Sequence, residues 1–138
     1  MRDESLIDQP TRAGDAPGNG VPLDPEEFLR VHPPFDRLPA AAMEAVGKSL
    51  EIEYAGRNTT ILSRSEPRNE RLFVVRRGVV RLEAEKRRIE LLEEGECFGF
   101  PSLISGGSPT VDVIAEEECL LYRIPKTTFD RLMDEPSF

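Results

Sequence analysis

The segment FGFPSLISGGSPT, from Phe98 to Thr110, has the layout of a loop that wraps an anionic ligand. A Phe-Gly turn leads into a short helical stretch, a Gly-Gly tip follows, and a strand begins after the tip. Backbone N–H groups at the start of a helix commonly hold anions. However, none of the thirteen residues is charged. The loop therefore has no side chain of its own that could form an ion pair with such a ligand.

Other chemistry has little support in the residue types. His32 is the single histidine, and Cys97 and Cys119 are the only cysteines. A structural zinc site needs four Cys or His ligands, and a Ser-His-Asp set would have only this one histidine as its base. No Walker-type Gly-Lys-Ser is present. The sequence therefore predicts no enzyme, no cofactor and no metal. It also predicts that the two cysteines are reduced and that His32 is exposed at a helix end.

The composition predicts a soluble globular protein with one domain. The chain has 138 residues, of which 38% are hydrophobic and 32% are charged. The formal net charge of -8 repels a phosphate backbone, so nucleic-acid binding is not expected. No apolar run approaches the roughly 20 residues of a membrane span, and the N-terminus lacks the hydrophobic region of a signal peptide. We therefore expect a cytoplasmic protein without a membrane partner.

The positioning elements begin after residue 22. Residues 1–22 are rich in Asp, Gly, Pro and Asn, which predicts a flexible arm; a docking peptide is the alternative. A first helix is capped by Asp24, buries Phe28, Leu29 and Val31, and is stopped by the proline pair at 33–34. A second helix is predicted over about residues 39–47. Its inward residues are Ala42, Met43 and Val46, and Phe35 and Leu38 pack at the corner.

From residue 50 the apolar period changes to two. Alternating or short buried runs, separated by turn residues, predict strands at 50–55, 59–62, 72–75, 80–84, 89–92, 97–98, 111–115 and 120–124. Pro125 then starts a helix carrying Phe129, Leu132 and Met133, and Asp134-Glu135-Pro136 breaks it. Short strands with regular turns favour a β-sandwich or barrel flanked by helices.

Several of these segments resemble one known family at its own spacing. They are Tyr54-Ala55-Gly56, LFVVRRG at 72–78, LEEGECFG at 92–99, AEEE at 115–118 and YRIP at 122–125. Residues 23–138 resemble the cyclic-nucleotide-binding domain, which implies a mainly β fold: an eight-stranded jelly roll with flanking helices. The segment from Phe28 to Pro39 is similar to a bacterial group in which this domain precedes paired CBS domains and a nucleotidyltransferase domain.

This resemblance identifies the opening loop with the family's phosphate-binding cassette. There the turn is Phe-Gly-Glu, the Glu accepts from the ribose hydroxyl, helix amides grip the cyclic phosphate, and an Arg pairs with it. Phe100 stands in the place of the Glu and Thr110 in the place of the Arg, while Pro101 lacks an amide proton. Ser102 and Leu103 retain an amide pair. The candidate ligand-binding residues are Phe98, Gly99, Phe100, Ser102, Leu103, Pro109, Thr110 and Val111.

The two substitutions predict weak or absent cyclic-nucleotide binding. Leaving one partner of a buried charge pair unmatched costs about 2–5 kcal/mol, which is about 30-fold to several thousand-fold in affinity. Arg87 or Arg123 could replace the missing cation. On the alternative interpretation, Phe98, Phe100 and Leu103 only close the mouth of the barrel.

Three functions remain open. They are a regulatory module with a degenerate cassette, a nucleotide sensor with another ligand or binding mode, and a cupin-type enzyme, which the single histidine opposes. The resembled family also has a further C-terminal helix that lids the pocket. Here the sequence stops at Phe138. We therefore expect a missing or very short lid, and either a fragment of a longer protein or a homodimer.

Overall fold

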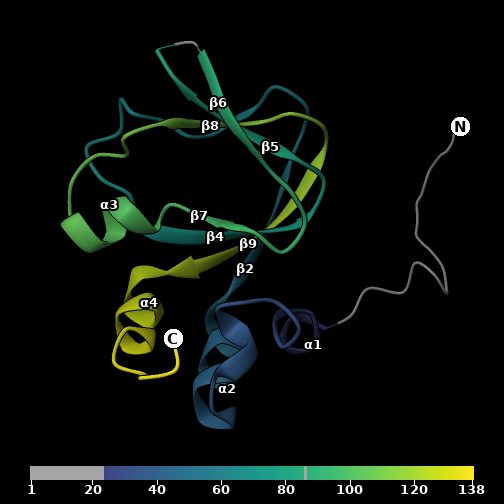
Figure 1. Ribbon diagram of the computed structural model, residues 1–138, viewed down its shortest axis with the longest axis vertical. Coiled ribbons are helices and arrows are strands. Elements are labelled where there is room, and N and C mark those ends of the chain that lie inside the picture. Colours follow the sequence, from purple (N-terminus) through teal and green to yellow (C-terminus); the bar gives the residue numbers. More distant parts are fainter. Residues whose placement is uncertain (1–23, 86) are drawn as a thin grey trace, which may run out of the picture.

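Two antiparallel sheets face each other across the centre of the molecule (Figure 1). The computed structural model describes residues 24–85 and 87–138; the predicted arm at residues 1–22 lies outside them. Within the described residues, one sheet has the order β2 (Glu51–Ala55), β9 (Cys119–Pro125), β4 (Arg71–Arg77) and β7 (Cys97–Phe98). The other has the order β3 (Thr60–Leu62), β8 (Asp112–Ala115), β5 (Val80–Ala84) and β6 (Arg87–Leu92). The strands predicted from the period of two are all present.

The strands β4 and β9 separate two apolar cores. Alternate residues on β4 point to opposite faces of the sheet. Leu72 and Val74 belong to a cluster with the helices, whereas Phe73 and Val75 belong to the cluster between the two sheets. A strand buried on both faces has a continuous apolar run in its sequence, which is why Leu-Phe-Val-Val carries no alternation.

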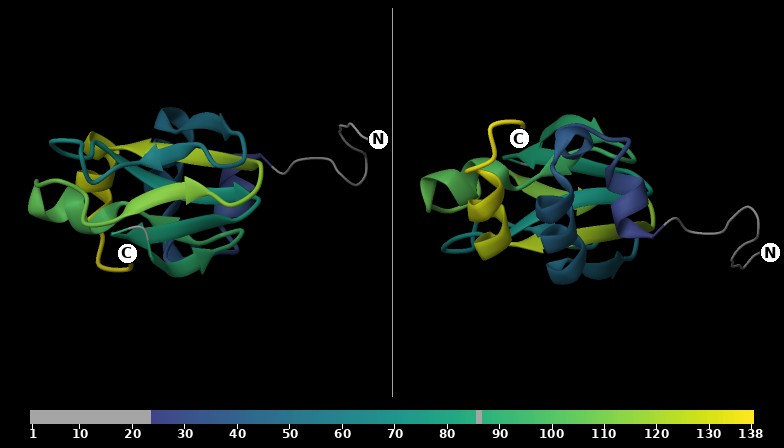
Figure 2. Two further views of the ribbon diagram at one scale, coloured as in Figure 1. Left: turned by 90° about the horizontal axis from the view of Figure 1, so that it is seen from above. Right: turned by 90° about the horizontal axis from the view of Figure 1, so that it is seen from below.

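Helices cover the outer face of the β2-β9-β4-β7 sheet (Figure 2). They are α1 (Pro25–Leu29), the 3-10 turn Phe35–Arg37, α2 (Ala40–Ser49) and α4 (Lys126–Leu132). Asp24 accepts a hydrogen bond from the Glu26 N–H at 3.0 Å, which confirms it as the N-cap. The Phe138 ring packs against the Phe35 ring with centroids 5.6 Å apart, so the chain end joins this helical layer. No helix among the described residues is long and apolar enough to cross a membrane.

Two residues predicted to face the core do not. Val31 is 68% exposed because α1 ends at Leu29 and Val31 follows in the turn. Met133 is 51% exposed because it is the C-cap of α4 rather than part of its buried face.

The alternation along β2 also has an unexpected outcome. Ala55 is buried between the sheets, whereas Ile52 and Tyr54 are exposed. Ile52 pairs with Tyr122, whose ring lies in the helical cluster, so Ile52 and Tyr54 point to the outer face at the edge of the sheet.

The expectation of an exposed His32 is also wrong. His32 is half-buried, its Nδ1 lies 2.8 Å from the Phe28 carbonyl oxygen, and its ring centroid is 4.3 Å from that of Phe28. The ring fills the space beside Gly95, where a Cβ would collide with it. Gly95 has a φ of 91°, so this position favours glycine on both grounds.

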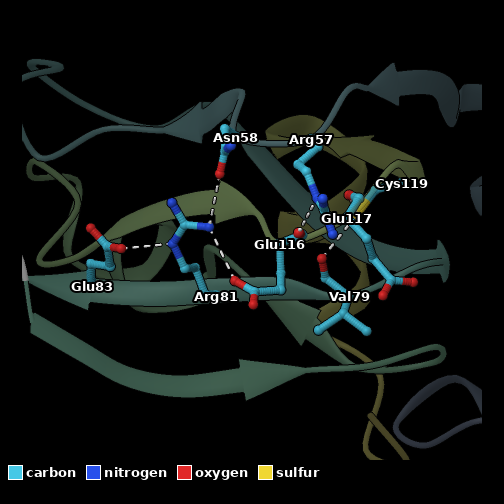
Figure 3. Close-up of polar contacts among 8 residues, drawn as sticks. All are labelled: Arg57, Asn58, Val79, Arg81, Glu83, Glu116, Glu117 and Cys119. Atoms are coloured by element: carbon cyan, nitrogen blue, oxygen red, sulfur yellow. Dashed lines mark hydrogen bonds and ion pairs between the residues drawn. The ribbon is translucent and has the colours of Figure 1, made fainter.

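An ion-pair network joins two turns to strand β5 on the outside of the β3-β8-β5-β6 sheet (Figure 3). Arg81 on β5 contacts Glu83 at 2.7 Å, Glu116 at 3.0 Å and Asn58 at 3.2 Å. Arg57 also donates to the Glu116 carbonyl oxygen at 3.3 Å. The network therefore connects β5 to the β2–β3 and β8–β9 turns. Glu116 links its own turn to β5 through its side chain and to the β2–β3 turn through its backbone carbonyl.

Candidate ligand-binding pocket

The Phe-Gly turn leads from β7 into a short helix, as the sequence predicts. Helix α3 (Phe100–Ser105) has Gly99 as its N-cap with a φ of 97°, and Gly106 ends it with a φ of 78°. A Cβ at Gly99 would lie 3.0 Å from both the Arg71 carbonyl oxygen and the Asn69 side-chain nitrogen. Both the positive φ and this close approach favour glycine at the turn.

Asn69 holds the turn in place, and sequence reasoning missed it. Its side chain is buried; Nδ2 donates to the Gly99 carbonyl at 2.8 Å and the Arg71 carbonyl at 2.6 Å, and Oδ1 accepts from the Arg71 N–H at 3.0 Å. The Ser102 hydroxyl donates to the same Gly99 carbonyl at 3.1 Å. An Asn two residues before a strand is a frequent turn residue, but nothing local indicates a partner thirty residues away.

A cavity of about 370 Å³ lies between this turn and the inner face of the β3-β8-β5-β6 sheet. This volume is within the usual range of small-molecule pockets. The lining residues are Leu62, Leu82, Glu90, Leu92, Glu96, Cys97, Phe98, Gly99, Phe100, Pro101, Ser102, Pro109, Thr110, Val111 and Val113. Of the eight candidate residues, all except Leu103 line the cavity.

The apolar candidates have different positions. Phe98 is buried and stacks on Phe73 with centroids 4.8 Å apart, so it forms the floor of the cavity. Phe100 is 46% exposed at the mouth. Leu103 is buried in the cluster with the helices, so it does not close the mouth as the alternative interpretation expected.

The charge of the lining is entirely negative. Among the described residues that line the cavity, Glu90 and Glu96 are the charged ones, and none is Lys or Arg. Arg123 instead contacts Glu51 at 2.9 Å and Glu53 at 3.4 Å on β2. Arg87 lies exposed at the start of β6 and is not part of the lining. Neither arginine supplies the cation that the opening loop lacks.

The helix start offers few donors. Pro101 has no N–H, and the Leu103 N–H lies 3.4 Å from the Gly99 carbonyl oxygen, to which it donates. The Ser102 hydroxyl donates to that same carbonyl. Thr110, which the resemblance places at the arginine position of the cassette, lines the cavity, and its side chain has a hydroxyl as its polar group.

Cys97 is the lining residue that carries a thiol, a potential nucleophile. Burial, with a smaller contribution from the nearby Glu96 carboxylate, raises the pKa of its thiol to about 12. The thiolate, which is the nucleophilic form, is therefore scarce at neutral pH. Both cysteines are free. Over residues 24–85 and 87–138, no group of three His, Cys, Asp or Glu side chains is placed to hold a metal ion.

A two-sheet antiparallel barrel, closed at one end by a Phe-Gly turn and short helix, defines a jelly-roll domain with an internal cavity. Residues 52–135, more than half of the chain, match the sequence model of the family described as "Cyclic nucleotide-binding domain". The chain belongs to this family.

Known relatives share this domain at low identity. The chain is 24% identical over 104 residues to the cAMP-dependent protein kinase regulatory subunit of Eremothecium gossypii, with 75% of this chain and 22% of that protein covered. It thus spans less than a quarter of that relative's length.

Two solved structures show the same fold. One is the regulatory domain of Toxoplasma gondii PKA with cAMP, with a TM-score of 0.74 and 20% identity over 81% of this chain and 45% of that chain. The other is the regulatory subunit of a cAMP-independent protein kinase A from Trypanosoma cruzi bound to guanosine. Its TM-score is 0.74 and its identity 16%, over 80% of this chain and 40% of that chain.

Proposed function

We propose that this chain is a regulatory domain of the cyclic-nucleotide-binding family, within a signal-transduction protein, whose cassette does not bind cAMP or cGMP tightly. The related proteins named above are regulatory subunits, which supports a regulatory role rather than an enzymatic one. The single histidine opposes a cupin-type metalloenzyme.

One observation carries the proposal: the cavity has two carboxylates and no cation among its lining residues. A cyclic phosphate would lose the ion pair that the family's Arg provides, at a cost of about 2–5 kcal/mol. It would also approach Glu90 and Glu96, and like charges repel. The Phe100 side chain, in the place of the family's Glu, offers no acceptor to a ribose hydroxyl.

A calorimetric titration of the purified domain with cAMP and cGMP tests the proposal. We expect dissociation constants above about 100 µM for both ligands, which corresponds to less than about 5.5 kcal/mol of binding free energy. A micromolar constant for either cyclic nucleotide would overturn the proposal.

The second candidate is a nucleoside sensor. The Trypanosoma cruzi protein with the same fold is bound to guanosine, a ligand without a phosphate. An uncharged ligand avoids both the missing arginine and the repulsion from Glu90 and Glu96. Guanosine in the same titration separates the two candidates, since a regulatory module without a ligand leaves it unbound.

The partners belong to the same proposal. The resemblance of the segment Phe28 to Pro39 to one bacterial group supports a CBS pair and a nucleotidyltransferase domain as neighbours in a longer, cytoplasmic protein. Phe100 at the mouth of the cavity is 46% exposed, and Ile104 on α3 is 62% exposed. Exposed apolar side chains at a pocket mouth support a homodimer or another covering segment.

A further inference from the structure

Glu90 lies on the cavity side of an edge strand. It pairs with Leu82 of β5, and residues directly opposite in an antiparallel pair point to the same face. Leu82 and the next residue on that face of β6, Leu92, both line the cavity. The outer face of β6 carries Ile89 and Leu91, which are 57% and 40% exposed. The strand therefore turns its charge toward the cavity and its aliphatic side chains toward solvent, the reverse of the usual arrangement.

Glu96 supplies the second carboxylate from the β6–β7 turn. Its Oε2 accepts a hydrogen bond from the Glu93 N–H at 2.9 Å, which limits the motion of the side chain. The rest of the wall is mainly apolar, with Leu62, Phe98 and Val111 among its members. Within the described residues no ion pair is formed by Glu90 or Glu96. Both residues are exposed to solvent, and the remaining wall of the cavity that they line is mainly apolar.

We propose that this pocket takes a small, mostly apolar molecule without negative charge, whose amino group donates a hydrogen bond to Glu90 with Glu96 nearby. This inference rests on the proposed function, in which the same pocket rejects cyclic nucleotides. A hydrogen bond to an ionised carboxylate is stronger than a neutral one, and the aliphatic and aromatic wall accommodates the ligand body. Two sources supply this chemistry: the amino group of a nucleobase, or an alkylammonium group on an aromatic body.

Matched probes test the charge and donor preference without knowledge of the natural ligand. 2-Phenylethylamine and 3-phenylpropanoate present a similar body with opposite charge, and guanosine and inosine differ by one amino group. Each is titrated into the isotope-labelled domain while the amide resonances of Leu92, Phe98 and Val111 are followed. We expect the amine to bind more tightly than the acid if the source is alkylammonium, and guanosine more tightly than inosine if it is a nucleobase.

The variant Glu90→Gln tests whether Glu90 causes the preference for the amino probe. It should weaken the preferred amino probe about two- to fivefold, the range for a partly exposed charged contact, and leave its amino-free partner unchanged. Glu27→Gln is the matched control, because it removes the same charge from an exposed position on α1 across the other sheet.

Three results would overturn the inference: equal binding within both probe pairs, equal effects of the two variants, or no shift of pocket resonances at about 10 mM of any probe. These results differ from failure of the proposed function, which is micromolar binding of cAMP or cGMP to the unmodified domain.

Discussion

At the scale of single residues, Phe100 and Thr110 stand where the resembled cassette carries a glutamate and an arginine. Both line the cavity, so the side chains at these positions reach the space where a ligand would lie. We predict that the double variant Phe100→Glu with Thr110→Arg binds cAMP at least about tenfold more tightly than the unmodified domain, because it restores a ribose acceptor and a phosphate cation. Pro101 limits the gain, since it still lacks an N–H.

Calorimetry with cAMP measures this gain. The double variant Phe100→Gln with Thr110→Gln is the control, because it introduces polar side chains without the charges. If the charged and uncharged variants bound cAMP equally well, the cassette would not be limited by the missing ion pair.

At the scale of elements, α3 is held to β4 by one buried side chain. Asn69 makes three hydrogen bonds that join the β3–β4 loop, β4 and the start of α3. We predict that Asn69→Ala lowers the free energy of unfolding by about 1–3 kcal/mol, because buried carbonyl and amide groups lose their partners. The amides of Leu103 and Gly106 should also exchange with solvent faster than those in β9.

Urea unfolding and amide hydrogen exchange together check this prediction. Ser65→Ala, an exposed change in the same loop, should alter stability by less than about 0.5 kcal/mol. Uniform exchange across the domain in Asn69→Ala would show that Asn69 contributes only to global stability and does not position α3.

At the scale of the whole molecule, the exposed pocket mouth bears on assembly. Phe100 at the mouth and Ile104 on the neighbouring helix α3 present their side chains to solvent, while Phe138 at the chain end packs in the helical layer on the other side of the sheet. We predict that two copies associate through the mouth at tens of micromolar, since apolar surface favours burial. Light scattering coupled to size exclusion measures the mass, and Ile104→Lys should produce the monomer. A monomeric unmodified chain would contradict the prediction, whereas a dimer that persists in Ile104→Lys would place the interface elsewhere.

Local patterns were sufficient for much of the fold. The strands between residues 50 and 124, the short helix after Gly99 and the N-cap at Asp24 were all predicted, because period, glycine turns and capping act over a few residues. Side-chain exposure at element ends was predicted less well: Val31 and Met133 have apolar side chains at helical spacing but lie beyond the buried face. The burial of His32 was not predicted because its neighbour Gly95 is distant in the sequence.

The sequence by itself determined the family resemblance, seven of the cavity's lining residues, and the absence of charge in the loop from Phe98 to Thr110. These follow from residue types at fixed spacing along the chain. Only the tertiary structure decided that Asn69 holds Gly99, that Arg123 turns to Glu51, and that Glu90 lines the pocket. Each of these depends on strand register, where a shift of one residue moves a side chain to the opposite face of the sheet.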